Sequence, residues 1–125
     1  MCGSCWTFAT TAILEGAHSV ETAGKDLISL SEQMFVDCVH GQYDYGYISE
    51  PMPCCAGCNG GDYDASFSWA GNTTASLILE SDYAYTATSP DNNCQYDDKP
   101  KTKVQVASYT DVPANNPAAL KLAVA

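Results

Sequence analysis

Two cysteines, Cys2 and Cys5, lie three positions apart in the run Cys2-Gly3-Ser4-Cys5-Trp6. A cysteine attacks a carbonyl as its thiolate, and a helix N-terminus stabilises a thiolate through unpaired N–H groups and aligned peptide dipoles. Cys5 stands where a helix is expected to begin, so it is a candidate nucleophile. Its backbone N–H could also bind the oxyanion of the attacked carbonyl, and Trp6 could shield the reaction from water.

The same spacing occurs in redox-active C-x-x-C pairs and in halves of zinc sites. A redox pair is disfavoured because no strand–helix–strand pattern surrounds the two cysteines. Zinc is disfavoured because the remaining Cys and His form no clean second ligand pair, although Cys55-x-x-Cys58 keeps a metal-binding alternative open. That alternative would use the side chains of His40, Cys54, Cys55 and Cys58. We expect no metal and no cofactor.

Four helices and one strand are expected to position these groups. The helices are predicted over 4–22, Ser31–Cys38, about Asp62–Gly71 and from Asn116 onward, and the strand over Val104–Tyr109. Residues 39–57 lack periodicity and are predicted to form a long loop pinned by cysteines. In the first helix, the residues expected to face the core are Phe8, Ala9, Ala12, Ile13, Gly16, Ala17 and Val20.

The composition limits the partners. Fifteen acidic residues against five Lys and Arg give a net charge of −10, which repels phosphate backbones and disfavours nucleic acid. No apolar run is long enough to cross a bilayer, so no membrane partner is expected. Seven cysteines are an odd number, which indicates disulfides plus one free thiol. The triplet that begins at Asn72 is a possible glycosylation site.

The run around Cys5 resembles the signature of papain-like cysteine peptidases, the papain and cathepsin family. Further landmarks of that family follow in its order: Phe8-Ala9, Leu14-Glu15-Gly16, Leu30-Ser31-Glu32-Gln33, Val36-Asp37-Cys38, Gly57-Cys58-Asn59-Gly60-Gly61, Glu80-Ser81-Asp82-Tyr83-Ala84-Tyr85 and Cys94. The resemblance covers essentially the whole chain. It implies an α+β fold for the intact domain, of which residues 1–125 would be the mainly helical left subdomain, with long disulfide-pinned loops and little strand.

The resemblance also implies roles for particular residues. It pairs Cys2 with Cys58 and Cys38 with Cys94, and leaves the state of Cys54 and Cys55 open between a vicinal bond, pairing with other chains and free thiols. Closure of the first pair would bring the glycine segment beside Cys5, where an extended substrate upstream of the cut could pair with the main chain. The expected substrate-binding residues are Gly3, Trp6, Gly60, Gly61, Asp62 and Tyr63. Asp62 stands where relatives often carry apolar residues, so it either favours a polar or basic side chain or is an N-terminal helix residue that interacts with the helix dipole.

Cys5 needs a general base, and the sequence offers only His18 and His40. His18 lies 13 residues along the same helix, roughly 20 Å away at about 1.5 Å per residue. His40 follows Cys38 in a loop, where a structural role is expected. The family's histidine and asparagine lie further downstream, and its oxyanion-hole glutamine lies upstream, so we expect this sequence to be part of the domain and inactive alone.

Three functions therefore compete. The first is a cysteine peptidase that forms an acyl-enzyme in the intact protein, in the lysosome, the vacuole or outside the cell. The second is a non-catalytic binding fragment or pseudo-peptidase that associates through its exposed interdomain face. The third is the metal-binding module. Expected partners are a peptide or protein substrate, the other half-domain, and a propeptide or cystatin-like inhibitor.

Overall fold

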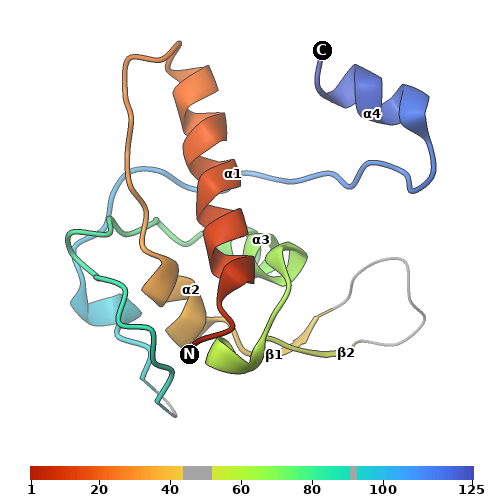
Figure 1. Cartoon of the computed structure of the whole chain (residues 1–125). Helices are drawn as coiled ribbons and strands as arrows, with labels where there is room; N and C mark the ends of the chain where they lie inside the picture. The colour runs from red at the N-terminus through yellow and green to blue at the C-terminus, as the bar shows by residue number, and fades with distance from the viewer. Residues whose placement is uncertain (44–51, 91–92) are drawn as a thin grey trace.

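The computed structural model describes residues 1–43, 52–90 and 93–125. Within them, the helices are α1 (Cys5–Glu21), α2 (Glu32–Cys38), α3 (Tyr63–Asn72) and α4 (Pro117–Ala123), and the 3₁₀ turns are η1 (Gly57–Asn59) and η2 (Tyr96–Asp98). The strands are β1 (Gly41–Tyr43) and β2 (Met52–Cys54). Figure 1 shows α1 as the long central helix and α4 set apart at the end of an extended segment. The architecture is mainly helical, as the sequence predicted.

Side-chain caps begin three of the four helices close to their predicted starts. The Ser31 hydroxyl accepts a hydrogen bond from the Met34 N–H at 2.9 Å, and the Asn116 side chain accepts one from the Ala119 N–H at 3.0 Å. Asp62 caps α3 in the same way. These caps satisfy N–H groups that a helix leaves unpaired in its first turn, which is why short polar residues mark the starts.

The core lies where α1, α2 and α3 meet the segment around Leu77 and Ile78. Helices α2 and α3 both pack against α1, and the largest side chains of the core come from α2 and this segment. Phe35, Leu77 and Ile78 are fully buried. The Ser31 N–H donates to the Ile78 carbonyl at 2.9 Å, so α2 is held to this segment by the main chain as well as by apolar contact.

The predicted core face of α1 was wrong. Its buried residues are Trp6, Thr7, Thr10 and Thr11, whereas Phe8, Ile13 and Val20 are 44%, 51% and 82% exposed. The threonine hydroxyls donate to carbonyls one turn earlier in the helix, for example Thr10 to Trp6 at 2.8 Å. Buried hydroxyl groups that are hydrogen-bonded cost little, so a threonine face can pack inward. An apolar stripe is left on the outer side of α1.

Two further expectations differ from the structure. Residues 104–109 form no strand: Gln105 makes one isolated bridge to Ser76, and among the described residues no strand lies beside the chain beyond it to continue the ladder. The segment 39–57 is not entirely loop, because β1 and β2 pair antiparallel with Gly41 opposite Cys54. Its centre, 44–51, lies outside the described residues.

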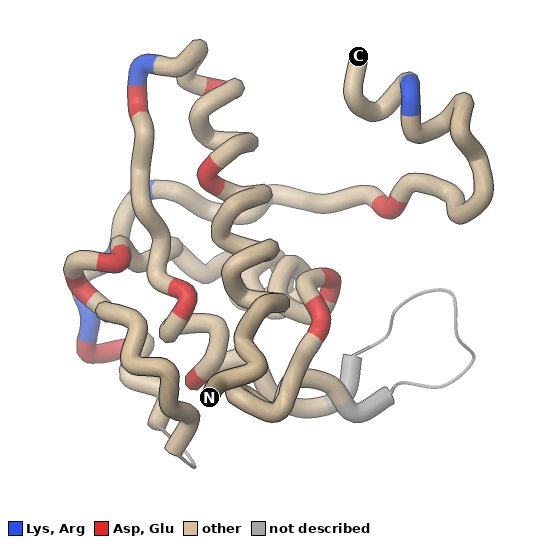
Figure 2. Tube along the Cα trace, in the orientation of Figure 1, with Lys and Arg blue, Asp and Glu red and all other residues tan. Residues whose placement is uncertain are grey.

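Charge is distributed unevenly over the fold. Figure 2 shows acidic residues over much of the chain but none on the N-terminal half of α1, and the first charged side chain in the sequence is Glu15. The positive end of the α1 dipole is therefore not neutralised by an acidic residue in its first turn. No helix among the described residues is both long enough and apolar enough to span a membrane.

A carboxyl group is enclosed where α2 meets the chain after Leu79. Glu80 accepts a hydrogen bond from the Tyr85 N–H at 2.8 Å through Oε1, while its buried Oε2 has no hydrogen-bond partner among the described residues. Burial, with a further contribution from the neighbouring Glu32, raises the pKa of Glu80 above its ordinary value of 4.5. The folded state therefore keeps the proton on this carboxyl to a higher pH than the unfolded state does.

This raised pKa makes stability depend on pH. Between 4.5 and the raised value, the folded state holds a proton that the unfolded state has released, so stability is present at low pH and falls as pH rises. Glu80→Gln, which cannot ionise, should reduce this fall. The urea midpoints of both proteins between pH 4 and pH 7 would measure it, with the exposed Glu21→Gln as control. Equal slopes in wild type and Glu80→Gln would contradict the assignment.

Candidate active site

Cys5 is the first residue of α1. It is exposed, and of the seven cysteines it alone stands outside a disulfide. As the first helical residue it has an N–H with no acceptor inside the helix. The Ser4 side chain does not cap this helix; its hydroxyl instead bonds to the Tyr85 hydroxyl. A thiol and an unpaired N–H are thus presented together at the positive end of the helix, as the sequence predicted.

The glycine segment is fastened to this helix end by a disulfide and a main-chain bond. Cys2 is bonded to Cys58, which is the pairing that the resemblance implied. The Gly3 N–H donates to the Cys58 carbonyl at 2.7 Å. A Cβ on Gly3 would stand 2.8 Å from that same oxygen, so a side chain at Gly3 would prevent the approach. Gly3 therefore allows the chain before α1 and the segment at Cys58 to pack closely together.

Trp6 lies beneath the glycine segment. It is 4% exposed, and its indole N–H donates to the Gly57 carbonyl at 3.2 Å. A Cβ on Gly61 would come within 2.5 Å of two atoms of the indole ring, so the main chain at Gly61 lies directly on the ring. In this chain Trp6 supports the segment that a substrate would pair with, and its predicted contact with substrate stays a prediction.

Gly61→Ala should disturb this contact. The added methyl group would overlap the indole of Trp6, and we expect a loss of about 1–3 kcal/mol in unfolding free energy, as for overpacked interiors. Gly16→Ala is the matched control, because a Cβ there meets nothing within 4 Å and alanine favours a helix interior by about 0.5–1 kcal/mol. Chemical denaturation of both variants would measure these changes. Unchanged stability of Gly61→Ala would contradict the proposed packing.

A groove of about 440 Å³ borders the glycine segment, lined by residues 54–56 and 59–62. Gly60 has a φ of +116°, a conformation that favours glycine, and its carbonyl accepts a hydrogen bond from the Ala56 N–H at 2.9 Å. Gly60 is half-buried and Gly61 is exposed. The main chain at these glycines is therefore open on the side that the groove forms.

Asp62 and Tyr63 begin α3. The Asp62 carboxylate accepts a hydrogen bond from the Asp64 N–H at 3.0 Å, which is the capping role. Tyr63 is 48% exposed. Burial raises the pKa of Asp64, and nearby Asp111 and Asp62 raise it further. The Asp62 carboxylate thus caps α3, and Asp62 is also one of the residues that line the groove.

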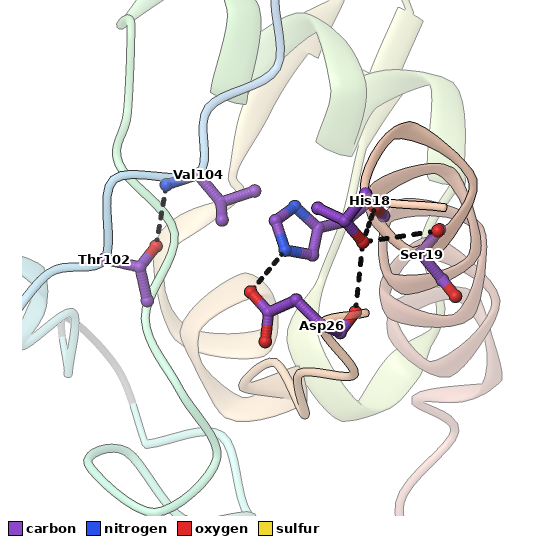
Figure 3. A network of polar contacts seen from close by, with 6 residues as sticks. His18, Ser19, Asp26, Thr102 and Val104 are labelled. Atoms are coloured by element: carbon purple, nitrogen blue, oxygen red, sulfur yellow. Dashed lines mark hydrogen bonds and ion pairs between the residues drawn. The ribbon is translucent and has the colours of Figure 1, made fainter. Parts of the chain in front are cut away.

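Neither histidine is placed to act on Cys5. Figure 3 shows His18 near the C-terminal end of α1, where its Nε2 lies 2.9 Å from Asp26 Oδ2. The His40 ring bridges two carbonyl oxygens, that of Cys55 from Nδ1 at 3.1 Å and that of Asp37 from Nε2 at 2.8 Å. Both therefore serve the fold in this chain.

The remaining cysteines are all in disulfides. Cys38 is bonded to Cys94, as the resemblance implied, and Cys54 is bonded to its neighbour Cys55. With Cys2 and Cys58 joined, Cys5 has no partner for a redox C-x-x-C pair. The metal-binding alternative loses its thiolates for the same reason, and no metal-binding group of His, Cys, Asp and Glu occurs in the described part of the chain. Asn72 is exposed at the end of α3, and its glycosylation stays a prediction.

Two parts of the site had no sequence signal. Ser89 holds the turn before the glycines, because its hydroxyl accepts a hydrogen bond from the Cys58 N–H at 3.2 Å. A serine 31 residues away carries no spacing that would indicate this contact. The sequence also did not indicate that Cys54 and Cys55 line the groove as a bonded pair, because adjacent cysteines are compatible with several states.

Curated and solved proteins resemble this chain over most of its length. It is 43% identical to the probable cysteine protease RD19B of Arabidopsis thaliana over 91% of the chain and 29% of that protein. It is 40% identical to the probable cysteine protease RD21B of the same plant, over 99% of the chain and 23% of that protein. The chain thus spans less than a third of the length of these relatives.

The fold agrees with solved enzymes. The Carica candamarcensis cysteine protease CMS1MS2, in complex with E-64, matches 98% of this chain and 49% of its own at a TM-score of 0.76 and 30% identity. The bromelain protease of Ananas comosus, in complex with the E64 inhibitor, matches 98% of the chain and 48% of its own at a TM-score of 0.73 and 28% identity. A family model described as papain family cysteine protease matches residues 1–125. The chain therefore belongs to the papain family of cysteine proteases.

Proposed function

We propose that the protein containing this chain is a cysteine peptidase whose nucleophile is Cys5. The observation that carries the proposal is the single free, exposed thiol at the N-terminus of α1, beside an open glycine segment. The Cys5 thiolate attacks the carbonyl carbon of a peptide bond, the bond to the leaving amine breaks after that amine gains a proton, and an acyl-enzyme remains. Water then attacks the thioester and releases the acid together with the thiol.

The substrate is a peptide or protein in an extended conformation. Gly60 and Gly61 offer main-chain groups to residues upstream of the cut, since neither carries a side chain that would prevent close approach. The Cys5 N–H donates to the oxyanion. Asp62 borders the same groove, so a polar or basic substrate side chain there would meet its carboxylate.

The base and the second half of the domain come from outside residues 1–125. His18 and His40 are engaged by Asp26 and by main-chain carbonyls, so the imidazole that accepts the Cys5 proton is supplied by another part of the protein. The apolar stripe of α1, at Phe8, Ile13 and Val20, is the surface that this part would cover. Residues 1–125 alone should show no thiol-dependent turnover.

The exposed stripe also supports the second candidate, a binding role without catalysis. A surface with three large apolar side chains on one helix favours association with a partner half-domain, a propeptide or an inhibitor. Analytical ultracentrifugation of residues 1–125 tests this role: self-association that Phe8→Ser and Ile13→Ser abolish favours it, and a monodisperse monomer at high concentration argues against it.

The three disulfides favour an oxidising route such as secretion, the lysosome or the vacuole, because such bonds rarely persist in a reduced cytosol. The acidic net charge suits an acidic compartment, where protonation reduces self-repulsion. Fractionation of cells that express the tagged full protein would test this.

Labelling by E-64, the inhibitor present in two of the structures above, tests the peptidase proposal directly. The full protein should gain the mass of one inhibitor molecule on the peptide that contains Cys5, and Cys5→Ala should gain none. Labelling of the alanine variant, or none of the wild type under conditions where iodoacetamide modifies Cys5, would overturn the assignment.

A further inference from the structure

We propose that the Cys54–Cys55 disulfide is a reducible wall of the groove beside Gly60 and Gly61, and that its redox state sets which substrate side chain the groove accepts. The proposal rests on the proposed peptidase function. The disulfide joins neighbouring residues, and both line the groove together with residues 59–62. The covalent ring of two side chains and the glycine main chain are therefore both part of the lining of one groove.

The ring holds the main chain in an unusual conformation. Cys55 has a φ of +67°, the left-handed region that residues with a Cβ rarely adopt. Its carbonyl is held by the His40 ring at 3.1 Å, and Cys55 is 6% exposed. While the bond is intact, Cys55 cannot easily leave this conformation, because its side chain is tied to the residue before it.

The conformation of Cys55 orients the N–H of the next residue, which makes a hydrogen bond across the turn between Cys55 and Gly60. The next residue, Ala56, donates its N–H to the Gly60 carbonyl at 2.9 Å. If Cys55 relaxes to a negative φ, the peptide plane that carries the Ala56 N–H rotates away and the Gly60 carbonyl loses its partner. Reduction would thereby loosen the turn from Cys55 to Gly60 and widen the groove.

Reduction of this bond leaves the fold intact. The Cys2–Cys58 and Cys38–Cys94 bonds each close a loop with a sequence separation of 56, whereas Cys54–Cys55 has a separation of 1. Removing a cross-link between neighbours frees no long loop, so it adds almost no entropy to the unfolded chain. The pair can therefore change state while the rest of the molecule keeps its constraints.

The reaction requires a dithiol reductant. Its thiolate attacks Cys54 Sγ, since Cys54 is the more exposed of the two residues; a mixed disulfide forms and the Cys55 thiolate leaves and takes up a proton. The second thiolate of the reductant then attacks the mixed disulfide and releases Cys54, which is protonated in turn. Two electrons and two protons pass to the pair, and the reductant becomes a disulfide.

The first test is hydrogen exchange in the full protein, which does not depend on peptidase activity. Dithiothreitol should reduce Cys54–Cys55 in the folded protein, as measured by differential alkylation and mass spectrometry. Exchange at the Ala56 amide should then accelerate at least about tenfold. The variant Cys54→Ser with Cys55→Ser should exchange rapidly at Ala56 with or without dithiothreitol. A Cys54–Cys55 bond that dithiothreitol leaves intact in the folded protein, or unchanged exchange at Ala56 after its reduction, would overturn the proposal.

The second test measures specificity with peptides that differ in the residues upstream of the cut. Reduction of the wild type, and the double serine variant, should each change the ratio of kcat/KM between bulky and small side chains at one upstream position at least about fivefold, in favour of bulky ones. Equal ratios in all three proteins would overturn the role in specificity. If the protein cleaves no peptide and takes up no E-64, the peptidase proposal fails, while hydrogen exchange still decides whether the disulfide controls the turn.

Discussion

Cys5→Ser should lower kcat/KM of the full protein toward peptides by at least about 10⁴-fold, the scale seen when a catalytic nucleophile is lost. Serine keeps nearly the size and position of the side chain at the start of α1, but its hydroxyl ionises far less readily than a thiol. The helix N-terminus and the histidine, which stabilise a thiolate, therefore activate the neutral serine hydroxyl poorly. Steady-state kinetics with a fluorogenic peptide would measure the loss.

The fold should not change with this substitution. Cys5 is exposed and forms no disulfide, so the thermal midpoint of Cys5→Ser should match that of the wild type. The proposed oxyanion contact comes from the main chain and would survive in both Cys5→Ser and Cys5→Ala. Because serine alone keeps a hydroxyl that can attack, we expect residual activity above Cys5→Ala. Activity of Cys5→Ser within tenfold of the wild type, with the fold intact, would show that another residue is the nucleophile.

Removal of the Cys2–Cys58 disulfide should have a large effect on stability. The bond closes a loop with a sequence separation of 56, for which the chain-entropy relation predicts about 4 kcal/mol. Cys2→Ser with Cys58→Ser should lower the free energy of unfolding by about that amount. Because the bond also fastens the glycine segment to the start of α1, peptide binding should weaken at temperatures where the variant is still folded.

The chain supplies a matched control. Cys54→Ser with Cys55→Ser removes a disulfide whose sequence separation is 1, so the loop term nearly vanishes and the free energy of unfolding should change by less than about 1 kcal/mol. Urea denaturation of the two double variants at one pH compares them directly. Equal losses in both would show that loop closure does not account for the stabilisation.

Much of the local structure follows from residue types. Ser31, Asp62 and Asn116 mark helix starts because their short side chains accept hydrogen bonds from N–H groups of the first turn. Gly24 follows α1 with a φ of +74°, the conformation that ends many helices. Each of these interactions joins residues a few positions apart, so a single sequence contains all its partners.

The errors arise where the partner lies far along the chain or in another part of the domain. The direction that α1 faces depends on what packs against it, and hydrogen-bonded threonines could be buried as well as its apolar residues. Whether 104–109 forms a strand depends on a neighbouring strand, and within the part of the chain that the structure describes this segment makes a single bridge, at Ser76. The hydrophobic pattern of the sequence therefore predicts neither which side of α1 is buried nor whether 104–109 forms a strand.

From residue types alone, Cys5 could be placed at the start of a helix and a glycine pair after Cys58, and the family resemblance indicated how Cys2 and Cys58 are joined. The position of Trp6 beneath Gly61 and the bond between Cys54 and Cys55 in the groove wall became known from the folded chain. The difference lies in the range of the interactions. Helix starts and helix dipoles arise from neighbouring residues, whereas packing, burial and the choice among possible disulfides depend on distances that exist only once distant segments have come together.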